Sequence, residues 1–280
     1  MATKTKFSMQ NVAAGNKQAR KACPKVADLL REGPTHHEPS EEVTRKLGSH
    51  QLIAGIDLET NDFLEGKKPS CIGRFGHHCW CAPVDLRYRI VQIGWVVGSS
   101  AKDDPITDRQ EHLVTPCGYL ISEKAAKKHG ITDEIATRDG RPLADVLEQF
   151  MQAIWSLHKS GGVIVSHHLE FDAGIIDEEL QRCGMDEWQS LWRTVAMQGV
   201  CTLDLSIQDW FQTACGRMKG PGEKTLVLNL KNSVMLFYSK SPQVRDLLLK
   251  AHTAGADAEL HLLLYQALRR LACEVKPSQP

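Results

Sequence analysis

The 280-residue chain lacks any apolar run long enough to cross a bilayer. Its longest apolar stretches, such as 163–165 and 262–265, fall far short of the roughly 18 residues that a membrane span needs. The first 20 residues also lack the apolar core of a secretory signal. The nine cysteines are odd in number and scattered along the chain. We therefore expect no membrane segment, reduced thiols and an intracellular location, in the cytoplasm or nucleus.

Neither sign of charge is in excess, because 34 Lys and Arg residues balance 34 Asp and Glu residues. Hydrophobic residues make up 42% of the chain and charged residues 24%, which is ordinary for a globular protein and excludes collagen, a coiled coil and a wholly disordered chain. Zero net charge gives no indication of a nucleic-acid partner. It does not exclude one, because bound metal ions can supply positive charge locally.

Residues 1–48 have few side chains that could build a core, with only seven Leu, Ile, Val or Phe. The first 27 residues carry six Lys or Arg and no acidic residue. We interpret residues 1–48 as a disordered, basic and polar tail. Such a tail is either simply solvated, an organelle-import peptide or an arm that binds a polyanion. Residues 49–275 are predicted to form one domain, followed by a short tail at 276–280.

The order of elements within this domain predicts an α/β fold with a mixed sheet. Three strands come first, and helices then alternate with single short strands. The strands are expected at 51–59, 89–97, 112–115, 162–166 and 200–203, and the helices at 122–129, 143–158, 172–183, 205–213, 243–251 and 256–273.

Acidic residues occur in three places where core residues are expected. Asp57 and Glu59 stand two residues apart in the first strand, so they lie on one face of the sheet, opposite Ile56 and Leu58. Burying two carboxylates so close together costs several kcal/mol unless a cation lies between them. Exposure on an edge strand is the alternative.

Asp172 and Asp257 each stand at the N-terminal end of an apolar helix stripe. Either could be a helix N-cap, a common place for Asp. Taken together, the four carboxylates carry a charge of about −4, which two Mg²⁺ or Mn²⁺ ions would neutralise, since both metals prefer oxygen ligands. Two such ions clamp the attacking and leaving oxygens in phosphoryl displacement.

Three segments, Asp57-Leu-Glu59-Thr60, His167 to Asp172 and His252 to Asp257, resemble the motifs of the DEDD superfamily of 3′→5′ exonucleases. That superfamily includes the bacterial polymerase proofreading subunit, RNase T, oligoribonuclease and the Trex nucleases. Its DEDDy branch has a Tyr four residues before the last Asp, where this chain has Thr253. The chain therefore resembles the DEDDh branch, with His252.

The resemblance implies a ribonuclease H-like fold, with a mixed five-stranded sheet flanked by helices. It also implies metal-dependent hydrolysis of phosphodiester bonds at the 3′ end of DNA or RNA, with release of 5′-mononucleotides. A non-cleaving nucleic-acid-binding module or a scaffold subunit on the same fold is the alternative. A single-stranded 3′ end is the expected partner, and a homodimer stays open.

Each role implied by the resemblance falls on a residue of this chain. Four carboxylates are expected to hold two Mg²⁺ or Mn²⁺ ions, and His252 is expected to act as the general base. A His near its ordinary pKa of about 6.5 suits that task. The carboxylates are Asp57, Glu59, Asp172 and Asp257, and the residues expected to contact the terminal nucleotide are Leu58, Thr60, His129 and Phe171.

The chain departs from the family pattern by an insertion at residues 61–87. Its sulfur and imidazole groups either bind zinc or are free thiols and side chains of a surface loop, because the compressed spacing matches no standard zinc motif. Arg74, Phe75 and Trp80 are expected to stack on or pair with nucleic acid at the mouth of the site. The four potential zinc ligands are Cys71, His77, Cys79 and Cys81.

A second departure is the long, basic stretch 216–240 between the second and third motifs. We expect either contacts with backbone phosphates or a solvated loop. The basic residues concerned are Arg217, Lys219, Lys224 and Lys231.

Overall fold

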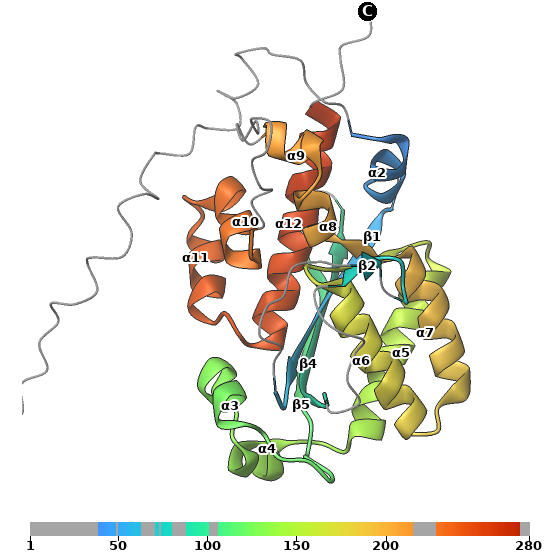
Figure 1. Ribbon diagram of the computed structural model, residues 1–280, viewed down its shortest axis with the longest axis vertical. Helices are drawn as coiled ribbons and strands as arrows, with labels where there is room; N and C mark the ends of the chain where they lie inside the picture. Colours follow the sequence, from blue (N-terminus) through green and yellow to red (C-terminus); the bar gives the residue numbers. More distant parts are fainter. Residues whose placement is uncertain are drawn as a thin grey trace, which may run out of the picture.

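A computed structural model describes residues 39–48, 50–62, 71–72, 74–79, 88–100, 106–214 and 228–274 (Figure 1). The elements in chain order are α2 (Glu41–Lys46), β1 (Leu52–Thr60), β2 (Cys71–Ile72), β3 (His78–Cys79), β4 (Ile90–Ser99), β5 (Ile106–Leu113), α3 (Glu123–His129), α4 (Asp133–Asp139), α5 (Leu143–Lys159), β6 (Val163–Ser166), α6 (Leu169–Arg182), α7 (Asp186–Gln198), β7 (Val200–Cys201), α8 (Thr202–Ser206), α9 (Asp209–Ala214), α10 (Leu230–Tyr238), α11 (Pro242–Leu249) and α12 (Ala254–Glu274).

Five strands form one mixed sheet in the order β5-β4-β1-β6-β7. The first three strands of this sheet, β1, β4 and β5, are antiparallel neighbours, with β4 between β1 and β5. Strands β6 and β7 add on the other side of β1 in parallel. The expected mixed five-stranded α/β sheet is therefore confirmed. Strands β2 and β3 pair separately as a small antiparallel ribbon.

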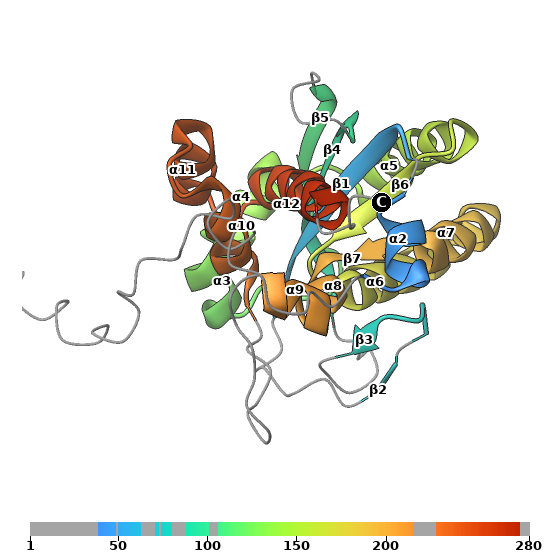
Figure 2. The ribbon, with the colours of Figure 1, turned by 90° about the horizontal axis from the view of Figure 1, so that it is seen from above.

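Helices cover both faces of this sheet (Figure 2): α12 lies on one face, and α5, α6 and α7 lie on the other. The side chains of β1 alternate between the two layers as expected. Ile56 and Leu58 belong to the hydrophobic cluster that includes α5 to α7. Ile53 belongs to the cluster that includes α12. The face predicted to carry Asp57 and Glu59 is thus the face that α12 covers.

Two glycines let α12 approach the sheet backbone to backbone. A Cβ atom at Gly55 of β1 would lie 2.0 Å from the carbonyl oxygen of Ala258. At Gly94 of β4 it would lie 2.3 Å from the carbonyl carbon of Ala254. No larger residue fits at either position without moving the helix. The start of α12 therefore sits directly on the strand that carries the acidic pair.

The ordered domain begins earlier than position 49. Helix α2 starts after Ser40, whose hydroxyl oxygen accepts the N–H of Val43. Val43 and Leu47 are buried against the α12 side of the core, and the hydroxyl of Tyr265 donates to the carbonyl oxygen of Lys46 at 3.2 Å. Residues 41–47 thus belong to the domain, not to the tail. Residues 1–38 and 275–280 lie outside the described residues.

Other elements differ from the expectation in extent or number. The third strand, β5, begins at Ile106 and not at 112. The helix expected at 205–213 is two helices, α8 and α9. The hydroxyl of Ser206 donates to the carbonyl oxygen of Leu203 at 2.8 Å, a local bond that competes with helix continuation. Helices α4, α7 and α10 were not predicted.

Candidate active site

Strand β1 and the N-terminal turns of two helices bring four carboxylates together. Asp57 and Glu59 come from β1, and their side chains face α12. Asp172 is the fourth residue of α6, and Asp257 is the fourth residue of α12. The N-cap alternative is therefore wrong for both Asp172 and Asp257, because each lies inside its helix.

Each of the two helical carboxylates has a fixed partner. The hydroxyl of Ser166, the last residue of β6, donates to Oδ2 of Asp172. The backbone N–H of His252 donates to Oδ2 of Asp257 at 3.2 Å. The second bond closes the turn between α11 and α12 and places His252 beside the carboxylates.

The potential metal-ligand atoms of Glu59, His252 and Asp257 all lie within 4.8 Å of one another. Among the described residues, no other group of three or more such side chains lies close enough to share an ion. Glu59 and Asp257 are buried, with 6% and 9% of their surface exposed, whereas His252 is exposed. The cluster is therefore open to solvent on the His252 side.

The electrostatics of the cluster are those of crowded, buried acids. Burial, together with the charges of Asp257, Asp172 and Glu59, raises the pKa of Asp57 well above its ordinary value. Burial raises the pKa of Glu59 and of Asp172 to about 7, and that of Asp257 to about 6. At neutral pH these groups can all be ionised only if positive charge enters the site.

These residues fit a pair of hard divalent cations. Oxygen donors are the ligands that Mg²⁺ and Mn²⁺ prefer, and four carboxylates supply the charge to balance two ions. Asp57, Glu59, Asp172 and Asp257 would hold them. The fit rests on the donor set and on the raised pKa values of the acids.

His252 has an unusual backbone conformation at the edge of the cluster. Its backbone φ is 69°. No other non-glycine residue in the described part of the chain has a positive φ. Such a conformation is uncommon and is often found at functional sites. Burial and the charges of Lys128 and Lys231 lower the pKa of His252. The imidazole is therefore neutral at neutral pH and able to accept a proton.

The residues expected to contact a nucleotide surround the end of β1. Leu58 and Thr60 are buried, and Phe171 is half-buried. Phe171 packs edge-on against Tyr88, with ring centroids 5.7 Å apart, and stacks on His168 at the same distance. Its neighbours thus hold the ring beside Asp172.

His129 links two elements of the protein through hydrogen bonds. Its Nε2 donates to the carbonyl oxygen of Thr60 at 3.2 Å, and its Nδ1 accepts the N–H of Ile131 at 3.1 Å. Both ring nitrogens are therefore engaged, and they tie the end of α3 to the end of β1. Lys128, the preceding residue, lowers the pKa values of Glu59, Asp172 and Asp257 through its charge.

The sequence did not single out His261, which lies beneath the cluster. Its Nδ1 donates to the carbonyl oxygen of Ile56 at 2.7 Å, and its Nε2 lies 3.8 Å from Oδ1 of Asp57. Burial lowers its pKa to about 3, so the ring is neutral. Its position four residues after Asp257, on the same helix face, was the signal available in the sequence.

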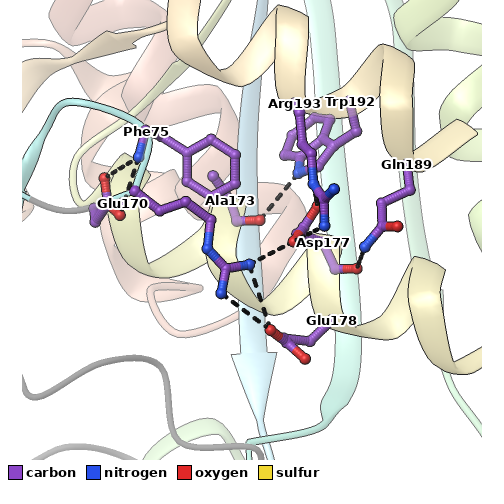
Figure 3. A network of polar contacts seen from close by, with 9 residues as sticks. Phe75, Glu170, Ala173, Asp177, Glu178, Gln189, Trp192 and Arg193 are labelled. Carbon is purple, nitrogen blue, oxygen red and sulfur yellow. Dashed lines mark hydrogen bonds and ion pairs between the residues drawn. The ribbon is translucent and has the colours of Figure 1, made fainter.

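The described part of the insertion packs on α6, and the role predicted for Phe75 is wrong. Phe75 is 3% exposed and belongs to the core, so it cannot stack on a base. Arg74 is paired with Asp177 at 2.5 Å and with Glu178 at 3.3 Å. Figure 3 shows Asp177 and Glu178 on α6, with Glu170 bonded to the backbone of Phe75. Trp80 lies outside the described residues.

The zinc alternative is not supported at His77. Its Nε2 is 3.3 Å from the carbonyl oxygen of Ala196, and its Nδ1 is 3.4 Å from Oδ2 of Asp204. Both nitrogens therefore face α7 and α8. Cys71 and Cys79 lie opposite each other in the β2–β3 ribbon, and Cys81 lies outside the described residues.

Comparison with solved structures shows a similarity of fold to an exonuclease at low sequence identity. The structure of Escherichia coli exonuclease I in complex with a dT13 oligonucleotide matches with a TM-score of 0.50 and 17% identity, over 78% of this chain and 41% of that chain. This chain therefore spans less than half of that exonuclease. The described helices include none that is long and apolar enough to span a membrane.

Two further solved structures are less similar. The zinc-bound form of the E. coli exonuclease I complex with single-stranded DNA gives a TM-score of 0.49 and 17% identity, over 76% of this chain and 39% of that chain. Cell-death related nuclease 4 gives 0.41 and 14%, over 78% and 63%. No protein-family model matches the chain, and no curated protein sequence matches it.

Proposed function

We propose that this protein is a metal-dependent 3′→5′ exonuclease that releases 5′-mononucleotides from a single-stranded end of DNA or RNA. One observation carries the proposal: potential ligand atoms of Glu59, Asp257 and His252 lie within 4.8 Å of one another, and Asp57 and Asp172 are close enough for the acids to raise the pKa of Asp57. The fold, which is similar to that of an exonuclease crystallised with single-stranded DNA, supports the same reading.

The reaction assigns a distinct task to each side chain. Asp57, Glu59, Asp172 and Asp257 would hold two divalent ions, which when bound stabilise the attacking and leaving oxygens of phosphodiester displacement. His252 would accept a proton from the attacking water. The water oxygen forms a bond to phosphorus as the bond to the 3′ oxygen breaks. The released nucleotide then keeps the 5′ phosphate, and the leaving 3′ oxygen takes a proton from solvent, so that the shortened strand ends in a 3′ hydroxyl.

The charges around the cluster suit a polyanionic substrate. Lys128 of α3 and Lys231 of α10 are exposed and lower the pKa of His252 through their charge. They therefore flank the open side of the site. Positive side chains beside His252 would contact backbone phosphates and so position the strand. Of the basic residues expected in 216–240, Arg217, Lys219 and Lys224 lie outside the described residues.

The test is digestion of 5′-labelled single-stranded DNA, single-stranded RNA and duplex DNA in Mg²⁺, Mn²⁺ or EDTA. We expect a ladder that shortens from the 3′ end and disappears in EDTA and in Asp57→Asn. Asp139→Asn, on the exposed surface of α4, is the matched control and should cut like the wild type. Tight binding without cleavage, in folded protein and in either metal, would refute the proposal and favour a non-cleaving binding module.

A further inference from the structure

The first N–H groups of α12 find their hydrogen-bond acceptors on the sheet. The N–H of Ala254 donates to Oε1 of Gln92 at 2.8 Å, and the N–H of Gly255 donates to Oε2 of Glu111 at 2.8 Å. Helix N-termini leave such groups without partners inside the helix. A side chain just before the helix usually supplies an acceptor, whereas here β4 and β5 supply two.

The strand register places both acceptors in line with the acidic pair. Gln92 of β4 lies opposite Glu59 of β1. In the next row, Asp57 lies opposite Gly94, which in turn lies opposite Glu111 of β5. Residues opposite one another share a face of the sheet. The two acceptors and the two strand carboxylates therefore form adjacent rows beneath the start of α12.

These bonds hold the segment that carries the rest of the site. Ala254 and Gly255 lie between His252 and Asp257 in the chain. The N–H of His252 donates to Asp257, which closes the same short segment on itself. A shift of the helix start would thus move His252 and Asp257 together, away from Asp57 and Glu59.

We propose that Gln92 and Glu111 are positioning residues that fix the start of α12, so that His252 and Asp257 lie against the carboxylates of β1. This inference rests on the proposed function for its catalytic meaning. Gln92 supplies an uncharged acceptor directly opposite Glu59, where a carboxylate would add a further negative charge. Glu111, one strand farther away and more exposed, holds the helix start through its carboxylate oxygen, and its charge adds to the raised pKa of Glu59.

Two leucine variants and one conservative variant test this role. Gln92→Leu and Glu111→Leu remove the acceptors, whereas Glu111→Gln keeps one. In hydrogen exchange, the leucine variants should speed the exchange of the 252–257 amides by about 2- to 30-fold, the range that loss of a helix cap produces. Mn²⁺ binding, measured by calorimetry, should weaken about 10- to 100-fold. Where the wild type turns over, kcat should fall and KM should stay within about 2-fold.

Glu111→Gln keeps an acceptor oxygen, so it should keep the wild-type exchange and weaken Mn²⁺ binding far less than Glu111→Leu does. Gln189→Leu is the matched control, because Gln189 is also a buried glutamine whose Nε2 donates to a backbone carbonyl, that of Asp177, at 3.0 Å. It should leave the exchange at 252–257 and Mn²⁺ binding unchanged. If Gln92→Leu does not fold, Glu111→Leu, at an exposed residue, carries the test.

Unchanged exchange and Mn²⁺ binding in the leucine variants would overturn the positioning role, as would equal effects of Glu111→Gln and Glu111→Leu. The two proposals fail separately. Wild-type protein that binds Mn²⁺, shows the expected exchange pattern and cuts none of the substrates would refute the exonuclease and leave the positioning role standing.

Discussion

Replacing Glu59 by glutamine should stabilise the metal-free protein at pH 8 while it removes catalysis. Burial raises the pKa of Glu59 from 4.5 to about 7, with Asp257, Asp172 and Glu111 adding to the rise and Lys128 opposing it. The folded state therefore keeps this proton up to about pH 7, whereas the unfolded chain releases it near pH 4.5. Because the folded state binds more protons in this window, its stability falls as pH rises.

The size of the effect follows from the shift. A rise from 4.5 to about 7 corresponds to about 3 kcal/mol of lost stability at pH 8. Glutamine avoids the charge but is also buried, so Glu59→Gln should gain about 1–3 kcal/mol at pH 8. At pH 5 the wild-type carboxyl is already protonated in the folded state, and the gain should drop below about 1 kcal/mol.

Urea unfolding in EDTA at pH 5 and pH 8, followed by tryptophan fluorescence, measures both values. The indoles of Trp95 and Trp192 are fully buried and will report the transition. Glu187→Gln, an exposed position on α7, is the matched control and should change stability by less than about 0.5 kcal/mol. A Glu59→Gln protein that is less stable than the wild type at pH 8 in EDTA would refute the reasoning.

Three further predictions concern single side chains. His252→Ala should lower kcat by about 10²–10⁴-fold with little change in stability, because the side chain is exposed; near-normal turnover would remove His252 as the base. Asp57→Ala should reduce cleavage to the level seen in EDTA, and residual metal-dependent cleavage would exclude Asp57 as an essential ligand. Phe75→Ala should cost about 3–5 kcal/mol in urea unfolding, since the ring is in the core; a loss below about 0.5 kcal/mol would mean that the insertion packs loosely.

The sequence predicted the placement of side chains correctly where that placement depends on residues close together in the chain. Alternation along β1 put Asp57 and Glu59 on the face opposite Ile56 and Leu58, and the structure confirms that division. The helix stripes correctly placed Asp172 toward the core. The helix starts were missed by two or three residues, because the helices predicted from 172 and 256 begin at Leu169 and Ala254. The acceptors at the start of α12 come from strands more than a hundred positions away, which no local pattern shows.

The prediction that Phe75 of the insertion contacts nucleic acid was wrong for a related reason. Phe75 and Arg74 look like exposed nucleic-acid contacts when read beside their neighbours in the chain. Their burial and pairing depend on Glu170 and Asp177, which lie 95 and 103 positions later. Acidic residues on a helix are usually interpreted as solvent-exposed. Their spacing in the sequence does not indicate that a distant loop will cover them. Contacts at such separation need the fold itself.

The same close approach that builds the site also makes it costly without metal. Gly55 and Gly94 allow α12 to rest on the sheet backbone, so Asp257 cannot move away from Asp57 and Glu59. Repulsion among these acids is then built into the fold, and only protons or cations relieve it. Mg²⁺ and Glu59→Gln should therefore stabilise by the same route, and their effects should fall short of additive. Full additivity at pH 8 would mean that the ion binds away from Glu59, and the carboxylate cluster would then lose its assignment as the metal site.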